Sequence, residues 1–165
     1  MARATTAWIG GDFQEVARTE DGVALCGGCR SEALCHYGLR TARLDAEHTA
    51  HFELTCPPEH EGGPGVAHGG WTAAVLDEVL GQLPLLLGSR SVTATLTAHY
   101  VKPVPLGRPL MARSWVDRRD GDKWFVSAEL VLASSGALLA TGTAVLIDRD
   151  PDAHFGGFEE WLAEQ

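Results

Sequence analysis

The sequence has no long apolar run and no excess of basic residues, and each absence excludes a class of protein. Its longest apolar run, LPLLLG, is far shorter than the roughly 20 residues that a membrane-spanning helix needs. The formal net charge of −9 argues against a nucleic-acid partner, because binding a duplex requires a basic face that neutralises phosphates. We therefore expect neither a membrane nor a nucleic acid as a partner.

The first residues, MARATTAWIGGDF, also lack the continuous apolar segment of an export signal, so we expect a cytoplasmic protein. We find no internal repeat, low-complexity tract or linker, and 165 residues suit one domain of ordinary size. The sequence therefore predicts a single domain over residues 1–165.

Cysteine is scarce, and three of the four cysteines fall in the segment CGGCRSEALCH. Without an export signal, we expect Cys26, Cys29, Cys35 and Cys56 to stay reduced. The Cys-x-x-Cys pair, the third thiol and His36 could form a tetrahedral zinc site, but a second well-spaced pair is missing. We favour a thiol-rich structural loop and no bound metal, with zinc as the alternative.

The chain does contain one apolar helical segment, followed by segments of alternating polarity. From Gly69 onward apolar residues lie on nearly all sides of a helix, as in a helix buried at the centre of a domain. After Gly88 the period changes to two. We predict strands at 91–101, 109–116, 124–132 and 137–147, turns at 117–123 and 133–136, and one or two strands from Leu39 to Cys56. This order predicts an α+β fold, in which an antiparallel meander wraps or covers one long helix.

The start and the middle of this helix carry residues that packing does not explain. His68, Gly69 and Gly70 stand at its start, where unpaired N–H groups and the positive end of the helix dipole can bind an anion or polarise a carbonyl. Asp77 falls among small apolar neighbours, and burying an unpaired carboxylate is costly. It is either a structural acid satisfied by threonine or backbone groups, or a functional one. The next residue, Glu78, points elsewhere, toward a rim or the solvent.

The spacing of these two features predicts a site shared between subunits. Gly69 and Asp77 are eight residues apart, which is roughly 12 Å along a helix axis. One aspartate side chain cannot bridge that distance. If both features act on one carbonyl, they come from different subunits of a dimer.

Three motifs in this order resemble the hotdog-fold thioesterases. They are HGG with an acid nine residues after the histidine, the segment TATLTAHYVKPVPLG with its Tyr-x-x-Pro end, and the closing ATGTAVLI. The resemblance is to the branch that contains the phenylacetate-pathway, second-type 4-hydroxybenzoyl-CoA and mitochondrial acyl-CoA thioesterases. It covers a core of about residues 22–148 and leaves an extension at each end. It implies a hotdog fold, a curved antiparallel sheet wrapped around one central helix, in a homodimer or a dimer of dimers.

The resemblance also implies a role for each candidate residue. The Gly69 or Gly70 amide would polarise the thioester carbonyl, and His68 would shape the loop. Asp77 of the facing subunit would act as a general base or a nucleophile, and Thr93 would orient the water or the carboxylate. Strand alternation places Thr93 on the polar face, opposite its apolar neighbours, and the sequence alone does not show whether this face meets the partner subunit.

An acyl-CoA is the expected substrate, and the coenzyme A it carries is the only cofactor-like group that we expect. Lys102, inside the Tyr-x-x-Pro segment, and Arg108 could meet its phosphates. We expect His99 and Tyr100 to be packing or rim residues. The final HFGGFEEWLAEQ predicts a short amphipathic helix that packs on the body or on a neighbouring subunit. The competing function is a non-catalytic binder of acyl thioesters, and neither the acyl group nor its carrier follows from the sequence.

Overall fold

The computed structural model describes residues 16–165, so most of the predicted N-terminal extension lies outside the described part. The strands are β1 (Leu39–Leu44), β2 (Ala50–Thr55), β3 (Glu61–Gly63), β4 (Val66–Ala67), β5 (Ser91–Tyr100), β6 (Pro109–Asp120), β7 (Lys123–Leu132) and β8 (Leu138–Asp148). The helices are α1 (Gly69–Leu86), α2 (Pro151–Phe155) and α3 (Phe158–Ala163), with 3-10 turns at Arg30–Glu32 and Pro58–His60.

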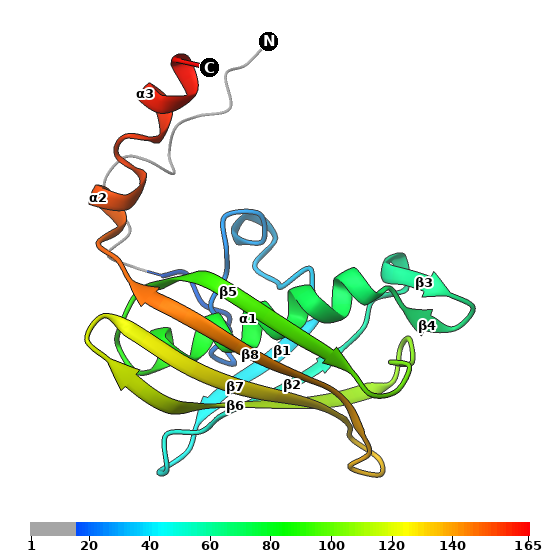
Figure 1. Ribbon diagram of the computed structural model, residues 1–165. Helices are drawn as coiled ribbons and strands as arrows, with labels where there is room; N and C mark the ends of the chain where they lie inside the picture. The colour runs from blue at the N-terminus through cyan, green and yellow to red at the C-terminus, as the bar shows by residue number, and fades with distance from the viewer. Residues whose placement is uncertain (1–15) are drawn as a thin grey trace.

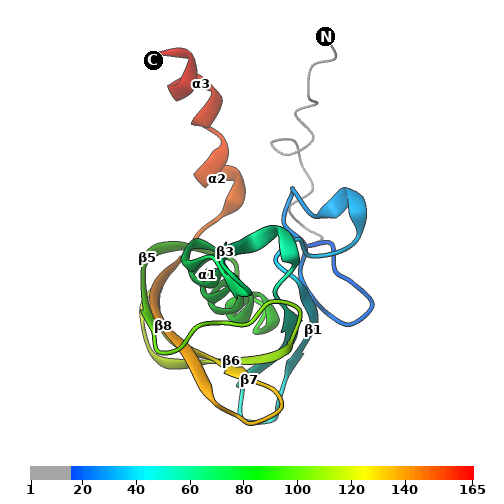
Figure 2. The same cartoon turned by 90° about the vertical axis from the view of Figure 1, so that its right-hand side faces the viewer.

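Six strands form one antiparallel sheet in the order β1-β2-β6-β7-β8-β5, and β3 pairs with β4 in a small separate hairpin. The sheet curves around α1, which lies along its concave face (Figures 1 and 2). This arrangement confirms the predicted α+β class and the predicted central helix. The ten-residue strand β5 stands at one edge of the sheet, with β8 as its partner on one side only.

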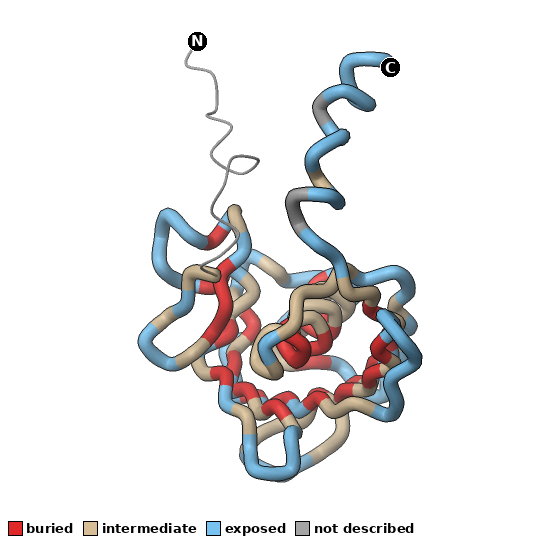
Figure 3. Tube along the Cα trace, turned by 90° about the vertical axis from the view of Figure 1, so that its left-hand side faces the viewer, coloured by how far each residue is buried: buried red, intermediate tan, exposed pale blue. Residues whose placement is uncertain are grey.

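The core lies between α1 and the concave face of the sheet, as the buried segments in Figure 3 show. Leu76, Leu80 and Leu83 of the helix are fully buried. Gly142 of β8 lets the backbone approach the helix closely, because an added Cβ would lie 3.3 Å from atoms of Leu76 and Leu80. Burial of one such leucine contributes about 1.5–3 kcal/mol, so the packing of α1 is a main source of stability.

A buried polar side chain fastens the segment before β1 to α1. Gln82 is 2% exposed, and its Oε1 accepts the N–H of Ala24 at 3.0 Å. Its Nε2 donates to the Ala24 carbonyl at 3.2 Å and to Oε1 of Glu78 at 3.0 Å. Each polar group of Gln82 therefore has a partner, as a buried amide requires.

The predicted turn at 117–123 is wrong for most of its length, because β6 continues to Asp120 and β7 begins at Lys123. The guanidinium of Arg118 lies 3.4 Å from the centre of the Phe125 ring, and that of Arg119 lies 4.2 Å from the Trp124 ring. These cross-strand cation–π contacts favour strand pairing for residues that look like turn formers in the sequence. The other three predicted strands of the meander agree with β5, β7 and β8, and the segment from Leu39 to Cys56 forms two strands.

The C-terminal residues form two short helices, α2 and α3, which extend away from the body (Figure 1). Phe158, Trp161 and Leu162 are half or more exposed. The predicted helical character is confirmed, but packing of these side chains on the chain's own body is not observed. Within residues 16–165, no helix has the length and apolar character that crossing a membrane requires.

Candidate active site

The start of α1 is held by the histidine that precedes it. His68 is the N-cap, and its Nδ1 accepts the N–H of Gly70 at 2.9 Å. The backbone N–H of His68 donates to the His60 carbonyl at 2.7 Å, and Gly62 packs so closely that a Cβ there would lie 2.5 Å from Cα of His68. The sequence His-Gly-Gly therefore produces a fixed, capped helix start.

The two glycine amides differ in what they offer to a ligand. The N–H of Gly70 is bound to His68, whereas among residues 16–165 we find no acceptor for the N–H of Gly69. Both glycines are exposed. Because the helix dipole is positive at this end, the Gly69 N–H is the available donor for a carbonyl oxygen or an anion.

A cavity of about 320 Å³ opens at this helix start. Its lining includes Gly69, Thr72, Tyr100 and Lys102. The predicted phosphate contact Lys102 is therefore beside the helix start. Arg108, the other predicted contact, is exposed and is not part of this lining.

The second half of the candidate site lies further along α1. Asp77 is half-buried, and Oγ1 of Thr93 donates to its Oδ1 at 2.8 Å. Thr93 is exposed and belongs to the edge strand β5. The structure thus joins these two predicted residues by a direct hydrogen bond.

A β-bulge explains how Thr93 reaches the helix. Thr93 pairs with Leu146 and Thr95 pairs with Val145, so Ala94 is the extra residue. Leu146 is fully buried on the helix side of the sheet, and Thr93 shares that side with it. Thr93 still lies opposite Val92, but its predicted placement opposite Leu96 is wrong, because Leu96 pairs with Ala144 on the same side of the sheet. Strict alternation fails at a bulge, where one inserted residue turns the side chains beyond it to the other face.

Glu78 differs from the expectation of a rim or solvent-facing acid. It is half-buried, and burial raises the pKa of its carboxyl. The hydrogen bond from Gln82 lowers this pKa, and the nearby charge of Asp77 raises it. Glu78 accepts a hydrogen bond from Gln82, which fastens Ala24 to α1, so its role in this network is structural.

In the thiol-rich loop Cys29 and Cys35 are buried and Cys26 is exposed, and Cys56, which follows β2, is also buried. Burial raises the pKa of Cys29 and of Cys56 to about 11 and also raises the pKa of Cys35. Over residues 16–165, no group of three or more His, Cys, Asp or Glu side chains is arranged to hold a metal ion. Cys29, Cys35 and Cys56 pack in the hydrophobic core, and the N–H of His36 donates to Sγ of Cys29 at 3.3 Å.

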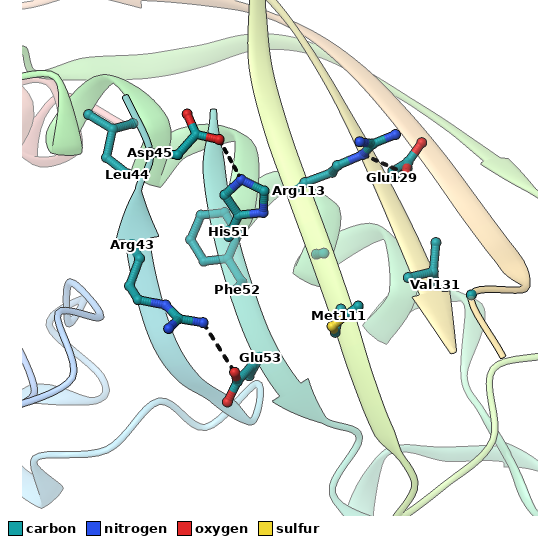
Figure 4. A pocket seen from close by; sticks show the side chains of 12 residues that line it. Arg43, Leu44, Asp45, His51, Phe52, Glu53, Met111, Arg113, Glu129 and Val131 are labelled. Atoms are coloured by element: carbon teal, nitrogen blue, oxygen red, sulfur yellow. Dashed lines mark hydrogen bonds and ion pairs between the residues drawn. The ribbon is translucent and has the colours of Figure 1, made fainter. Parts of the chain in front are cut away.

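A wider cavity, of about 670 Å³, lies on the face of the sheet opposite α1 (Figure 4). Its charged side chains pair with one another: Arg43 with Glu53 at 3.2 Å, His51 with Asp45 at 2.8 Å, and Arg113 with Glu129 at 2.6 Å. None of the predicted site residues lines it. With its acids and bases already paired, this cavity offers less chemistry than the helix start.

Sequence reasoning missed one residue of the site, Tyr100. Its hydroxyl donates to the Gly69 carbonyl at 3.0 Å, and its ring lines the cavity at the helix start. Its exposure and its place in the lining fit the rim residue that we expected, but its hydrogen bond to Gly69 was not predicted. Its place in the Tyr-x-x-Pro segment, beside Lys102, is the signal that could have identified it.

Within one chain the structure forms two separate halves. His68, Gly69, Gly70, Tyr100 and Lys102 gather at the start of α1. The pair formed by Asp77 and Thr93 lies about two helical turns away, because Asp77 is eight residues beyond Gly69.

Comparison with known proteins shows which family this chain resembles. Residues 64–137 match the model of the thioesterase superfamily. Acyl-coenzyme A thioesterase THEM4 of Xenopus laevis is 34% identical over 94 residues, which cover 57% of this chain and 42% of that protein. The chain thus matches about two fifths of the length of this curated relative.

Solved structures agree with the sequence match. The crystal structure of a thioesterase superfamily protein has a TM-score of 0.65 and 25% identity, covering 77% of this chain and 62% of that chain. A Bacillus halodurans protein crystallised with CoA has a TM-score of 0.57 and 25% identity, covering 66% of this chain and 73% of that chain. The chain is therefore similar to the thioesterase superfamily over residues 64–137, and its fold is the hotdog fold of these solved structures.

Proposed function

We propose that this protein hydrolyses acyl-CoA thioesters to a free acid and CoA. The observation that carries the proposal is the pair of complementary groups on α1: an unpaired N–H at Gly69 and a carboxylate at Asp77 oriented by Thr93. Thioester hydrolysis needs a donor for the developing oxyanion and a group that activates water or attacks the carbonyl. The name of the relative THEM4, an acyl-coenzyme A thioesterase, supports the same reaction.

The Gly69 N–H is the proposed oxyanion donor. It points from the positive end of α1 and has no acceptor among the described residues, whereas the Gly70 N–H is occupied by His68. The role of His68 is to hold the Gly70 amide and thereby the helix start. In other enzymes, loss of one oxyanion donor costs about 10²- to 10³-fold in rate.

Asp77 is the proposed base or nucleophile. Thr93 donates to Oδ1, which leaves Oδ2 to accept a proton from water or to attack the carbonyl carbon. As a base, Asp77 takes a proton from water while the oxygen of that water bonds to the carbonyl carbon. The tetrahedral intermediate then expels the CoA sulfur, which receives the proton. As a nucleophile, Asp77 displaces the CoA sulfur directly, and water hydrolyses the resulting mixed anhydride.

The two halves meet if the protein is a dimer that pairs its β5 edges. Thr93 and Asp77 lie near the beginning of β5, while Tyr100 and Gly69 lie near its end. Antiparallel pairing of two β5 strands about a two-fold axis places the beginning of one strand beside the end of the other. Asp77 then faces the Gly69 N–H of the partner subunit, and two sites form. A long exposed edge strand also favours such pairing.

The cavity at the helix start is the proposed binding place for the thioester and the adjoining part of CoA. Lys102 lines it and supplies a cation for a phosphate. The Bacillus halodurans structure was determined with CoA, which supports CoA as the carrier. Arg108 lies outside this lining, so we assign it no more than a distant role in attracting the anion.

The test is CoA release, followed with a thiol-reactive dye, over short, medium, long and aromatic acyl-CoAs. For Asp77→Asn we expect a loss of about two or more decades in kcat, since general acid–base or nucleophilic groups contribute that much. Thr93→Val should lower kcat and Thr93→Ser should retain most of it, because only serine keeps the hydroxyl. Asp120→Asn, at an exposed position on β6, is the matched control.

Two results would contradict the proposal. The first is the absence of turnover with every acyl-CoA, together with tight binding of a hydrolysis-resistant CoA analogue, which identifies a binder. The second is full activity of Asp77→Asn. A single turnover in 18O-labelled water separates the two mechanisms, because only the nucleophilic route places the label in the Asp77 carboxylate.

A further inference from the structure

Tyr100 makes a contact that an exposed side chain at the end of an edge strand does not need for folding. The residue is 59% exposed, so burial of its ring is not the reason for its orientation. Its hydroxyl donates to the Gly69 carbonyl at 3.0 Å. Its ring also lies beside Gly69, where an added Cβ would be 3.6 Å from Cε1 of the tyrosine.

The bonded carbonyl belongs to the peptide unit that joins Gly69 to Gly70. This planar unit is held at both ends, since Tyr100 binds its oxygen and Nδ1 of His68 accepts its N–H at 2.9 Å. Glycine places few limits on the rotation of the peptides beside it, so a Gly-Gly step has little orientation of its own. The two side chains add to the orientation that the first turn of α1 gives this peptide.

The orientation of this peptide decides where the neighbouring amide points. The N–H of Gly69 belongs to the preceding peptide, which is joined to the clamped one through Cα of Gly69. Rotation about the Cα–C bond of Gly69 changes ψ of this residue and thus the angle between the clamped peptide and the preceding one. The direction of the unpaired N–H relative to the helix, and to the cavity that Gly69 and Tyr100 both line, then changes.

We infer that Tyr100 is a positioning residue for thioester hydrolysis, which fixes the Gly69–Gly70 peptide and so aims the Gly69 N–H at the thioester carbonyl. This inference rests on the proposed function. Tyr100 and His68 act on opposite ends of one peptide, so neither replaces the other. A hydrogen bond to the carbonyl also polarises the peptide and strengthens the bond that its N–H gives to His68.

The decisive variant is Tyr100→Phe, which keeps the ring in the cavity and removes only the hydroxyl. We expect kcat to fall about tenfold while KM stays within about twofold, because the orientation of the Gly69 N–H is lost while the aromatic ring still fills the cavity. In other enzymes, misplacing a reacting group costs up to about 10²-fold. The melting temperature should stay the same, since the hydroxyl is exposed. Tyr37→Phe is the matched control, as the chain has two tyrosines and Tyr37 lies outside the proposed site.

A second measurement does not depend on turnover. Amide hydrogen exchange of Gly70, whose N–H is bonded to His68, should be faster in Tyr100→Phe and unchanged in Tyr37→Phe when followed by NMR. Unchanged kcat in Tyr100→Phe overturns the inference, and so does unchanged amide exchange. If the parent protein hydrolyses no acyl-CoA, the proposed function fails, whereas the exchange experiment still decides whether Tyr100 orients the peptide.

Discussion

Replacing Gly69 and Gly70 one at a time with alanine should separate the stability of the helix start from its chemistry. The two positions are adjacent and both exposed, but a methyl group meets different surroundings at each. At Gly69 it would lie 3.6 Å from the Tyr100 ring, which is ordinary contact. At Gly70 it would lie 2.9 Å from Nδ1 and 3.2 Å from Cε1 of the His68 ring, so the ring must move and its cap is lost.

The expected stabilities follow from two opposing terms. Alanine is favoured over glycine in a helix by up to about 1 kcal/mol, and loss of an N-cap costs about 1 kcal/mol. Gly69→Ala gains the first term without the second, so it should be at least as stable as the parent. Gly70→Ala gains the first term but also loses the cap, and we expect it to be less stable than Gly69→Ala by about 1 kcal/mol or more. For a domain of this size that difference corresponds to about 2–4 °C in Tm.

In Gly69→Ala we expect a loss of activity without a loss of stability. The methyl of Gly69→Ala enters the cavity beside the proposed oxyanion donor, so kcat/KM for CoA release should fall by about 10²-fold in a protein that is not destabilised. Thermal unfolding and the dye assay on the same preparations make the comparison. Parental activity in Gly69→Ala would refute close approach of the substrate to this amide. Equal stability of the two variants would refute the capping role of His68.

Three further outcomes follow from buried groups. Gln82→Leu should lower the free energy of unfolding in urea by about 2–4 kcal/mol, because the N–H and carbonyl of Ala24 lose their partner; a change under 1 kcal/mol would contradict this. Because the pKa of Glu78 is raised, the folded state binds its proton more tightly, and this group's contribution to stability falls as pH rises above 4.5. Glu78→Gln should therefore raise Tm at pH 7 and not at pH 4, and an equal gain at both would refute the sign. Iodoacetamide at pH 8 should modify the exposed Cys26 first, because at a pKa of about 11 only about one Cys29 thiol in a thousand is ionised; equal rates by mass spectrometry would disagree.

Local patterns in the sequence predicted the central helix, most of the strands and the positions of the candidate site residues on α1. The apolar helix from Gly69, the alternating strands after Gly88 and the two halves of the site on α1 all follow from periodicity and spacing. The position of Asp77 beside a threonine was expected from a resemblance, and the hydrogen bond to Thr93 is observed. The structure leaves the catalytic roles of these residues as predictions.

The features that escaped prediction depend on pairing between distant segments. The bulge at Ala94 is defined by its register with β8, and nothing in the alternation of β5 marks it. The length of β6 depends on cross-strand contacts such as that between Arg118 and Phe125. Tyr100 was missed because its partner, a backbone carbonyl, carries no side-chain signal.

The two contacts between β5 and α1 explain why a long side chain stands at position 100. The helix ends of these contacts, Gly69 and Asp77, are about 12 Å apart along α1. The strand ends, Thr93 and Tyr100, are about 20 Å apart along β5, since their partners on β8, Leu146 and Ala140, are six steps of about 3.3 Å apart. The hydroxyl of Thr93 reaches Asp77 directly, so the mismatch of about 8 Å falls at the other end. A tyrosine, with its hydroxyl about 6 Å from the backbone, can reach back to Gly69, and a serine or threonine at the same position could not.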